Sequence, residues 1–156
     1  MIELIGWIAV FGIWVFTVAN YLELPEIIPI HYNEVEAADS FGNKSNILAL
    51  PITSSLLFIG LTILNKRPNV FNYPSEITKE NALFQYTNAT RMIRFLKIIV
   101  MIIFGWIVFK TIQNVNGNTD GLGTWFLPLT MGMIFIPIIY FLINTNRRKK
   151  MAKSII

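Results

Sequence analysis

The sequence predicts an all-α, polytopic membrane protein: a four-transmembrane-helix bundle with a compact outward-facing loop between helices 1 and 2. Hydrophobic residues make up 54% of the 156 residues and charged ones 14%, whereas soluble domains use about 45–50% and about 25%. Four runs lack Asp, Glu, Lys and Arg: Leu4–Leu22, Ser45–Asn65, Ile98–Phe109 and Gly121–Asn146. Because about 20 apolar residues cross a bilayer, residues 1–156 are expected to form one membrane domain.

The first span, about residues 4–22, resembles a signal peptide in its apolar run. Its start carries Glu3 and no basic residue, so a retained helix is favoured. The outer loop, 23–45, comes next. Ser45 or Asn46 is expected to cap the second span, about 46–65, and Pro51 to bend it.

A cytoplasmic loop, 66–93, separates the second span from the third, about 94–112. The third apolar run is short, and Lys97 and Lys110 flank it. Both are expected to extend their ammonium groups to the lipid headgroups. From Ser75 to Gly105 no proline or glycine interrupts the chain, which predicts one long helix that starts in water with Ser75 as its N-cap.

The fourth span, about 124–144, contains Pro137, which is expected to kink it. The tail, 146–156, is rich in basic residues and is expected to bind anionic lipid at the inner leaflet.

Basic residues set the predicted orientation. Eleven of the 13 fall in the 66–97 stretch or the tail: Lys66, Arg67, Lys79, Arg91, Arg94, Lys97, Arg147, Arg148, Lys149, Lys150 and Lys153. The positive-inside rule then places both termini in the cytoplasm. This arrangement favours a lipid bilayer over nucleic acid as the partner of the basic residues, and the absence of cysteine excludes thiolate sites.

The outer loop is expected to be ordered. Pro25 and Pro29 disfavour helix in the residues before them, so His31 and Asn33 should lie in an extended segment and point the same way. The run from Asp39 to Asn43 has the residue types of a tight turn, in which Gly42 or Asn43 is free to take positive φ.

Chemistry is limited to this loop. The spans contain no acidic residue for proton coupling, and common catalytic motifs are absent. His31, the single histidine, could bind a metal with Asp39, change its charge in mild acid or contact a peptide, or it could only bond a helix end. Asn33 and Asp39 could equally bond turn amides, and Lys44 could neutralise a carboxylate or a lipid phosphate.

A set of residues in and beside the loop carries a family resemblance: Leu24-Pro25, Ile28-Pro29, His31, Asn33, Asp39, Phe41-Gly42, Lys44 and Pro51. This pattern resembles domain of unknown function 1648, which also forms the N-terminal part of proteins similar to the sporulation-delaying-protein immunity factor. Phe71–Pro74 and Ile77–Ala82 resemble the cytoplasmic stretch after that domain in four-span members. The resemblance implies a bacterial inner-membrane protein with site positions His31, Asn33, Asp39, Gly42 and Lys44.

The family usually has a glycine just before the aspartate, where this chain has Glu36 or its neighbours. If that glycine supplies positive φ, the loop of this chain is expected to turn by another route.

The residues leave three hypotheses of function. The first is a non-enzymatic inner-membrane interaction protein, immunity-like, whose outer loop binds a peptide toxin or a membrane partner protein. The second is a small transporter or channel subunit. The third is a membrane enzyme or metal-binding protein that uses His31 and Asp39; no cofactor is predicted beyond this possible divalent metal.

Overall fold

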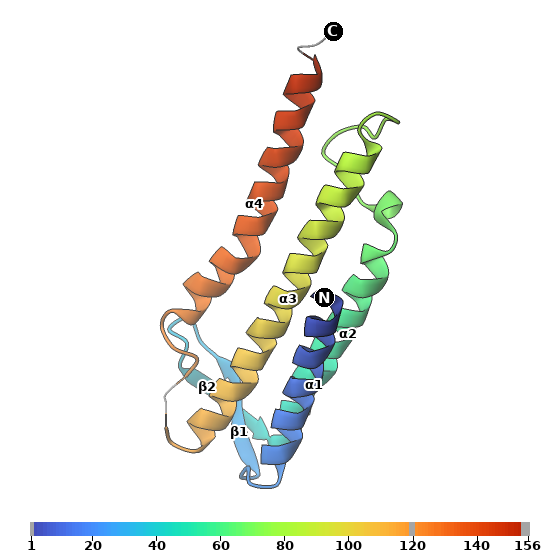
Figure 1. The fold of residues 1–156 in the computed structure, drawn as a ribbon. Helices are drawn as coiled ribbons and strands as arrows, with labels where there is room; N and C mark the ends of the chain where they lie inside the picture. Colours follow the sequence, from blue (N-terminus) through green and yellow to red (C-terminus); the bar gives the residue numbers. More distant parts are fainter. Residues whose placement is uncertain (1, 119–120, 154–156) are drawn as a thin grey trace.

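The structure, a computed structural model, describes residues 2–118 and 121–153, with side chains up to Thr145. Four helices run along one another (Figure 1): α1 Ile2–Tyr21, α2 Ala49–Asn65, α3 Ala82–Val115 and α4 Phe126–Lys153. Each contains a stretch long and apolar enough to cross a membrane. The predicted fold class, a multi-pass bundle of four helices, is confirmed.

Helix α3 is the centre of the bundle. It packs against α1 and α2 on one side and against α4 on the other, and Figure 1 shows α4 standing apart from the first two helices. The core between α1, α2 and α3 contains Val10, Ile13, Phe58, Met101 and Val108. The bundle is therefore a three-helix core with a fourth helix that depends on α3 and on contacts at its ends.

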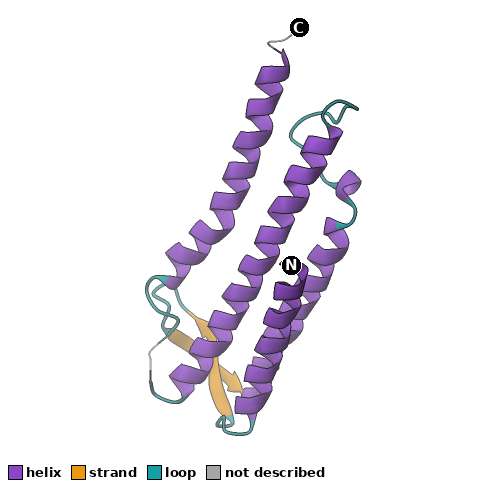
Figure 2. Ribbon diagram, in the orientation of Figure 1, coloured by secondary structure: helices purple, strands orange, loops and turns teal. Residues whose placement is uncertain are grey.

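The outer loop forms a β-hairpin, shown in orange in Figure 2. Strand β1, Ile27–Tyr32, pairs antiparallel with β2, Ala38–Asn43. The prediction of a tight turn at 39–43 was wrong, because these residues pair with β1. Neither Gly42 nor Asn43 has positive φ; the turn lies at residues 33–37, where Glu36 has a φ of 62°.

The prediction that α3 begins at Ser75 was also wrong, since the helix starts at Ala82. Asn81 holds the preceding segment out of helical conformation. Its Oδ1 accepts the N–H of Thr78 at 2.9 Å, and its Nδ2 donates to the carbonyl of Glu76 at 3.0 Å. These bonds satisfy backbone groups that a helix would have used.

A second local interaction orders the same connection. Tyr73 donates its hydroxyl to the carbonyl of Pro68 at 2.8 Å. Burial, and secondarily the neighbouring Tyr86, raise the pKa of Tyr73 to about 12. The phenol therefore keeps its proton, and the bond, at physiological pH.

Neither Ser45 nor Asn46 caps the second span with its side chain. The cap belongs to Asn43, whose Oδ1 accepts the N–H of Ser45 at 2.9 Å at the start of a 3₁₀ turn, η1, Lys44–Leu48, that leads into α2. The strand thus passes into the helix without an unsatisfied backbone donor at that position.

A glycine sets the contact between α1 and α2. A Cβ on Gly6 would overlap the ring of Phe58, which is fully buried, whereas a Cβ on Gly12 would meet nothing within 4 Å. We predict that Gly6→Ala lowers the free energy of unfolding by about 1–3 kcal/mol relative to Gly12→Ala, because the ring must move out of its packed position. The measurement is unfolding of both variants in the same detergent. Equal stability of the two would show that the ring yields freely.

Candidate functional site

The hairpin is bound to α3 through a tyrosine hydroxyl. Tyr32 Oη lies 3.1 Å from Thr111 Oγ1 and accepts the amide Nδ2 of Asn114, also at 3.1 Å. Thr111 is buried. The end of β1 is therefore bound to the C-terminal end of α3.

The hairpin is bound to α4 through Glu36. Its carboxylate is buried and accepts the backbone N–H groups of Phe126, at 3.3 Å, and of Leu127. Its carbonyl accepts the N–H of Leu122 at 2.9 Å. Since the first N–H groups of a helix have no partner within it and carry partial positive charge, this carboxylate satisfies the start of α4.

The backbone of Glu36 adopts the conformation that a glycine would have supplied. Glu36 itself takes the left-handed conformation that glycine adopts readily. The turn thus has the glycine-like geometry, and the expectation of another route was wrong. The two hydrogen bonds and the helix dipole offset the cost of positive φ in a residue with a side chain.

The structure brings His31 and Asp39 together. The Nδ1 of His31 donates to Oδ1 of Asp39 at 2.6 Å across the hairpin. Their side chains are 66% and 40% exposed, so the pair faces the solvent rather than the bundle. The arrangement can offer one ring nitrogen and one carboxylate to a ligand.

The other predicted site residues hold the hairpin in shape. Asn33 Oδ1 accepts the N–H groups of Val35 and Ala37, at 3.1 and 3.0 Å, and closes the turn. Asn33 comes after the end of β1, so it does not join His31 as expected. A Cβ on Gly42 would lie 2.9 Å from the side chain of Ile30. These two positions therefore serve the fold of the loop.

Lys44 also makes internal contacts. Its Nζ lies 2.9 Å from Glu26 Oε1, donates to the carbonyl of Leu24 at 3.5 Å, and lies 5.7 Å from the ring centroid of Tyr21. This is the charge-neutralising arrangement that the sequence left open. Over residues 2–118 and 121–153, no group of three or more His, Asp and Glu could hold a metal ion.

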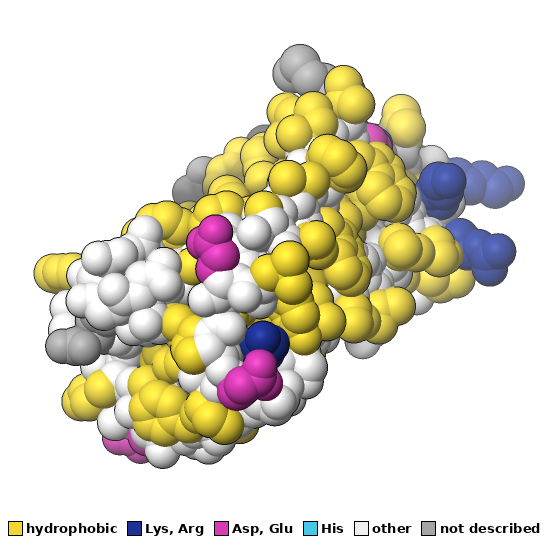
Figure 3. All heavy atoms as spheres, turned by 90° about the horizontal axis from the view of Figure 1, so that it is seen from below, with side chains coloured by type: hydrophobic (Ala, Val, Ile, Leu, Met, Phe, Trp, Pro, Cys, Tyr) yellow, Lys and Arg dark blue, Asp and Glu magenta, His cyan; other side chains and the backbone are white. Residues whose placement is uncertain are grey.

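The exposed surface of the hairpin is apolar and acidic. Four large apolar side chains on it are exposed: Ile27, Ile30, Val35 and Phe41. Glu23, Glu26 and Glu34 are exposed on the same loop. Figure 3, viewed from the hairpin end, shows apolar side chains interrupted by acidic ones. Such a mixture is suited to contact with a macromolecule.

A second polar cluster lies at the other end of the bundle, where α1, α2 and α3 meet. Lys97 Nζ lies 2.6 Å from both carboxylate oxygens of Glu3 and 2.9 Å from Thr62 Oγ1. It also lies 4.6 Å from the ring centroid of Phe58. Lys97 is fully buried, so the prediction that it extends to the lipid headgroups was wrong. An acid on a neighbouring helix provides a nearer partner.

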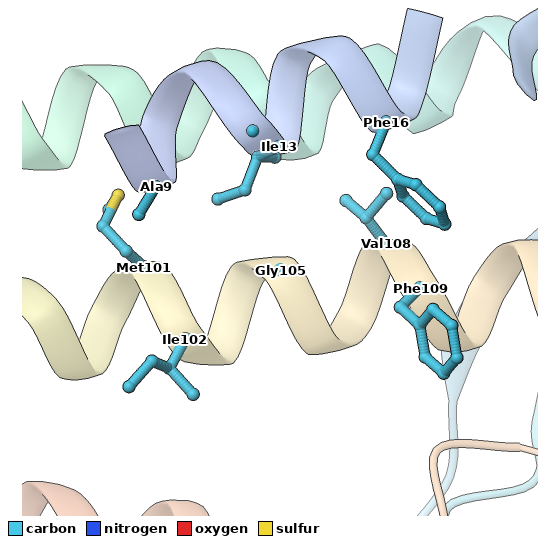
Figure 4. A pocket seen from close by; sticks show the side chains of 9 residues that line it. Ala9, Ile13, Phe16, Met101, Ile102, Gly105, Val108 and Phe109 are labelled. Atoms are coloured by element: carbon cyan, nitrogen blue, oxygen red, sulfur yellow. The ribbon is translucent and has the colours of Figure 1, made fainter. Parts of the chain in front are cut away.

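The apolar crevices of the bundle are of a different kind. One, of about 350 Å³, opens between α1 and α3 beside Ala9, Ile13, Gly105 and Phe109 (Figure 4). Another, of about 390 Å³, lies between α3 and α4. The first is lined by apolar residues and glycine alone, so it supplies packing surface but no group that could select a polar ligand.

Two features escaped the sequence. Glu3 precedes the charge-free run, so its pairing with a lysine 94 positions later was not visible. Glu36 was noted only as a departure from glycine. The sequence did contain an indication of this role, because an acidic residue stands where the family has a turn glycine. An acidic side chain can cap the start of a helix.

The four apolar helices define a multi-pass membrane protein, and the hairpin is its distinctive element. Residues 8–54, which span most of α1, the hairpin and the start of α2, match the family model described as Domain of unknown function (DUF1648). Over 76 residues the chain is 29% identical to an uncharacterized protein of Archaeoglobus fulgidus, covering 44% of this chain. The match covers 42% of that relative, so less than half of its length. No solved structure matches this chain.

We predict that Glu36→Gln weakens the attachment of α4. The amide keeps the length of the side chain but loses its charge and one acceptor atom, which should cost about 1–2 kcal/mol. Amide hydrogen exchange at Leu127 should become faster, and exchange at Phe126 should change less, because the N–H of Phe126 also donates to the carbonyl of Gly123 at 2.8 Å. Glu34→Gln, at an exposed position of the same turn, is the control and should leave both rates unchanged; equal rates in the two variants would contradict the assigned role.

We also predict an asymmetry in the Lys97–Glu3 pair. Glu3→Gln leaves a fully buried ammonium without an acid and should cost about 3 kcal/mol. Lys97→Met should cost less, because the Glu3 side chain is 45% exposed and can be hydrated.

The double variant should be about as stable as Lys97→Met alone, since the acid no longer has a cation to neutralise. Unfolding of the three variants in one detergent measures this. A greater loss in Lys97→Met than in Glu3→Gln would show that the pair is not buried in solution.

Proposed function

We propose that this chain is a non-enzymatic membrane interaction protein whose hairpin binds a peptide or a partner membrane protein. One observation carries the proposal: the hairpin is fixed to α3 through Tyr32 and to α4 through Glu36, yet it leaves Ile30, Phe41 and the His31–Asp39 pair exposed. A rigid apolar surface held in water is costly unless a partner covers it. Holding it rigid lowers the entropy lost on binding.

We further infer that the hairpin lies outside the cytoplasmic membrane, with both termini in the cytoplasm. Exposed basic residues at the opposite end support this orientation: Lys66, Arg67, Lys79, Arg91 and Arg94.

The charge of the hairpin indicates the class of its partner. Because the exposed hairpin carries acidic groups and Lys44 is already paired with Glu26, a cationic, partly apolar peptide is favoured, which is the chemistry an immunity-like protein would meet in a bacterial envelope.

A transporter or channel subunit is the second candidate, and the buried Lys97–Glu3–Thr62 cluster favours it. Intramembrane charges commonly mark ion or substrate paths. The acid of this cluster, Glu3, is in the first turn of α1, so the cluster is near the end of that span. Carriers usually bind their substrate near the middle of the membrane. The interaction role is therefore preferred. An enzyme or metal protein acting through His31 and Asp39 ranks third, since two ligands are few for a metal.

Photo-crosslinking in membranes of cells that make the protein tests the first proposal. A photoreactive side chain at Phe41 is expected to yield a discrete protein or peptide adduct. The same group at Leu56, exposed on the side of α2, should yield lipid adducts only.

Adding Asp39→Lys and Glu34→Lys should abolish the Phe41 adduct, because charge complementarity is lost. Identical products at Phe41 and Leu56 would refute the proposal.

A further inference from the structure

The hairpin has an open strand edge. Its sheet has two strands, and among the described residues only β1 pairs with β2. Strand β1 packs against α3, to which its Tyr32 side chain is bound. On the other strand, β2, the residues Asp39, Ser40 and Phe41 are exposed. Unpaired strand edges readily accept another strand.

Strand pairing shows which backbone groups face this edge. The N–H of Lys44 donates to the carbonyl of Glu26 at 2.9 Å, so the hydrogen-bonded positions of the antiparallel ladder fall at alternate residues from there. Phe41 lies opposite Pro29, which has no N–H to donate. Phe41 is thus at a non-bonded position, and its own N–H and carbonyl point away from β1.

We propose that β2 binds its partner by strand addition: an extended cationic peptide pairs with the open edge through the N–H and carbonyl of Phe41. This inference rests on the proposed function and specifies how the partner binds. In such complexes the backbone bonds supply affinity, and alternate side chains supply specificity.

Side chains beside the edge define the peptide. The apolar side chains of Ile30 and Phe41 are 47% and 59% exposed. They lie on opposite faces of the hairpin, because Phe41 pairs with Pro29 and a Cβ on Gly42 would meet Ile30. The carboxylate of Asp39 is partly exposed. Glu34 lies at the adjacent turn. An extended peptide that carries both apolar residues and lysine or arginine would complement these groups.

The edge is short and defined at both ends. At one end, the carbonyl of Asn43 accepts Nδ2 of Asn46 at 2.8 Å, where the strand passes into η1. At the other, Glu36 turns the chain onto α4. The open segment is therefore limited to a few residues, which suits one short peptide strand and disfavours the long edge-to-edge contact of a stable dimer.

The test uses the full chain in nanodiscs of zwitterionic phosphatidylcholine, which does not attract a cationic peptide electrostatically. The probe is an end-capped octapeptide of alternating lysine and valine. Two analogues carry backbone N-methyl groups, one on every lysine and one on every valine. Because N–H groups of alternate residues face opposite edges of a strand, each analogue blocks one edge only.

The parent peptide is expected to bind, one analogue to bind within about twofold of it, and the other about tenfold more weakly, as loss of the peptide N–H bond to the Phe41 carbonyl implies. Amide exchange at Phe41 should slow on binding of the parent peptide. Exchange at Gly42, whose position faces β1, is the internal control and should not change.

Other results would overturn strand addition. If both analogues bind as well as the parent, the peptide is held by side chains alone, and the proposed function survives without this mode of binding. If no peptide binds while the crosslink at Phe41 forms in cells, strand addition by a cationic peptide is wrong but the hairpin remains an interaction surface. If the Phe41 amide is protected before peptide is added, in proportion to protein concentration, a second copy occupies the edge instead.

Discussion

The bond between the Glu36 carboxylate and the start of α4 is the interaction on which the hairpin half of this structure depends. Helix α4 packs mainly against α3, and lipid provides no hydrophobic force that would press apolar helices together. The position of α4 therefore depends on van der Waals packing against α3 and on polar contacts. At the hairpin end the polar contacts include the two amides bound by Glu36 and the Leu122 N–H bound to the Glu36 carbonyl. The Nε1 group of Trp106 also donates to the carbonyl of Leu122 at 3.2 Å.

The opposite end of α4 is held by the same kind of interaction. Asn144 Nδ2 donates to Asn88 Oδ1 at 3.2 Å, and Asn88 Nδ2 donates to the fully buried Thr145 at 3.4 Å. Lys97 fulfils a similar role for α1 and α2. Polar groups near the helix ends thus help to fix the order of the bundle, and the bond from Trp14 Nε1 to Ser55 Oγ, at 3.0 Å, joins α1 to α2 between them.

Much of the architecture could be predicted because lipid restricts the solutions. A charge-free run of about 20 residues in a bilayer must satisfy its backbone bonds internally, and a helix does so.

Other features of the structure depend on contacts between distant residues. The hairpin was missed because Asp39–Asn43 has the composition of a turn, and only its pairing with Ile27–Tyr32 makes it a strand. The prediction of where α3 begins was wrong for a related reason. Ser75 has a suitable N-cap side chain, but Asn81 makes local bonds that keep residues 76–81 out of the helix.

Two of the predicted site residues, His31 and Asp39, are in contact, which their positions in one loop made possible. Asn33 and Gly42 instead stabilise the hairpin, a distinction that depends on geometry and not on residue type.

The choice of glutamate at position 36 shows how the fold and the open edge are linked. Glycine would take positive φ at no steric cost but would leave the amides of Phe126 and Leu127 without this acceptor. Glutamate in this conformation costs of order 1–3 kcal/mol, but its carboxylate binds the start of α4 from within the turn. Because that turn continues directly into β2, the same residue that holds the fourth helix also sets the direction of the strand whose outer edge stays open.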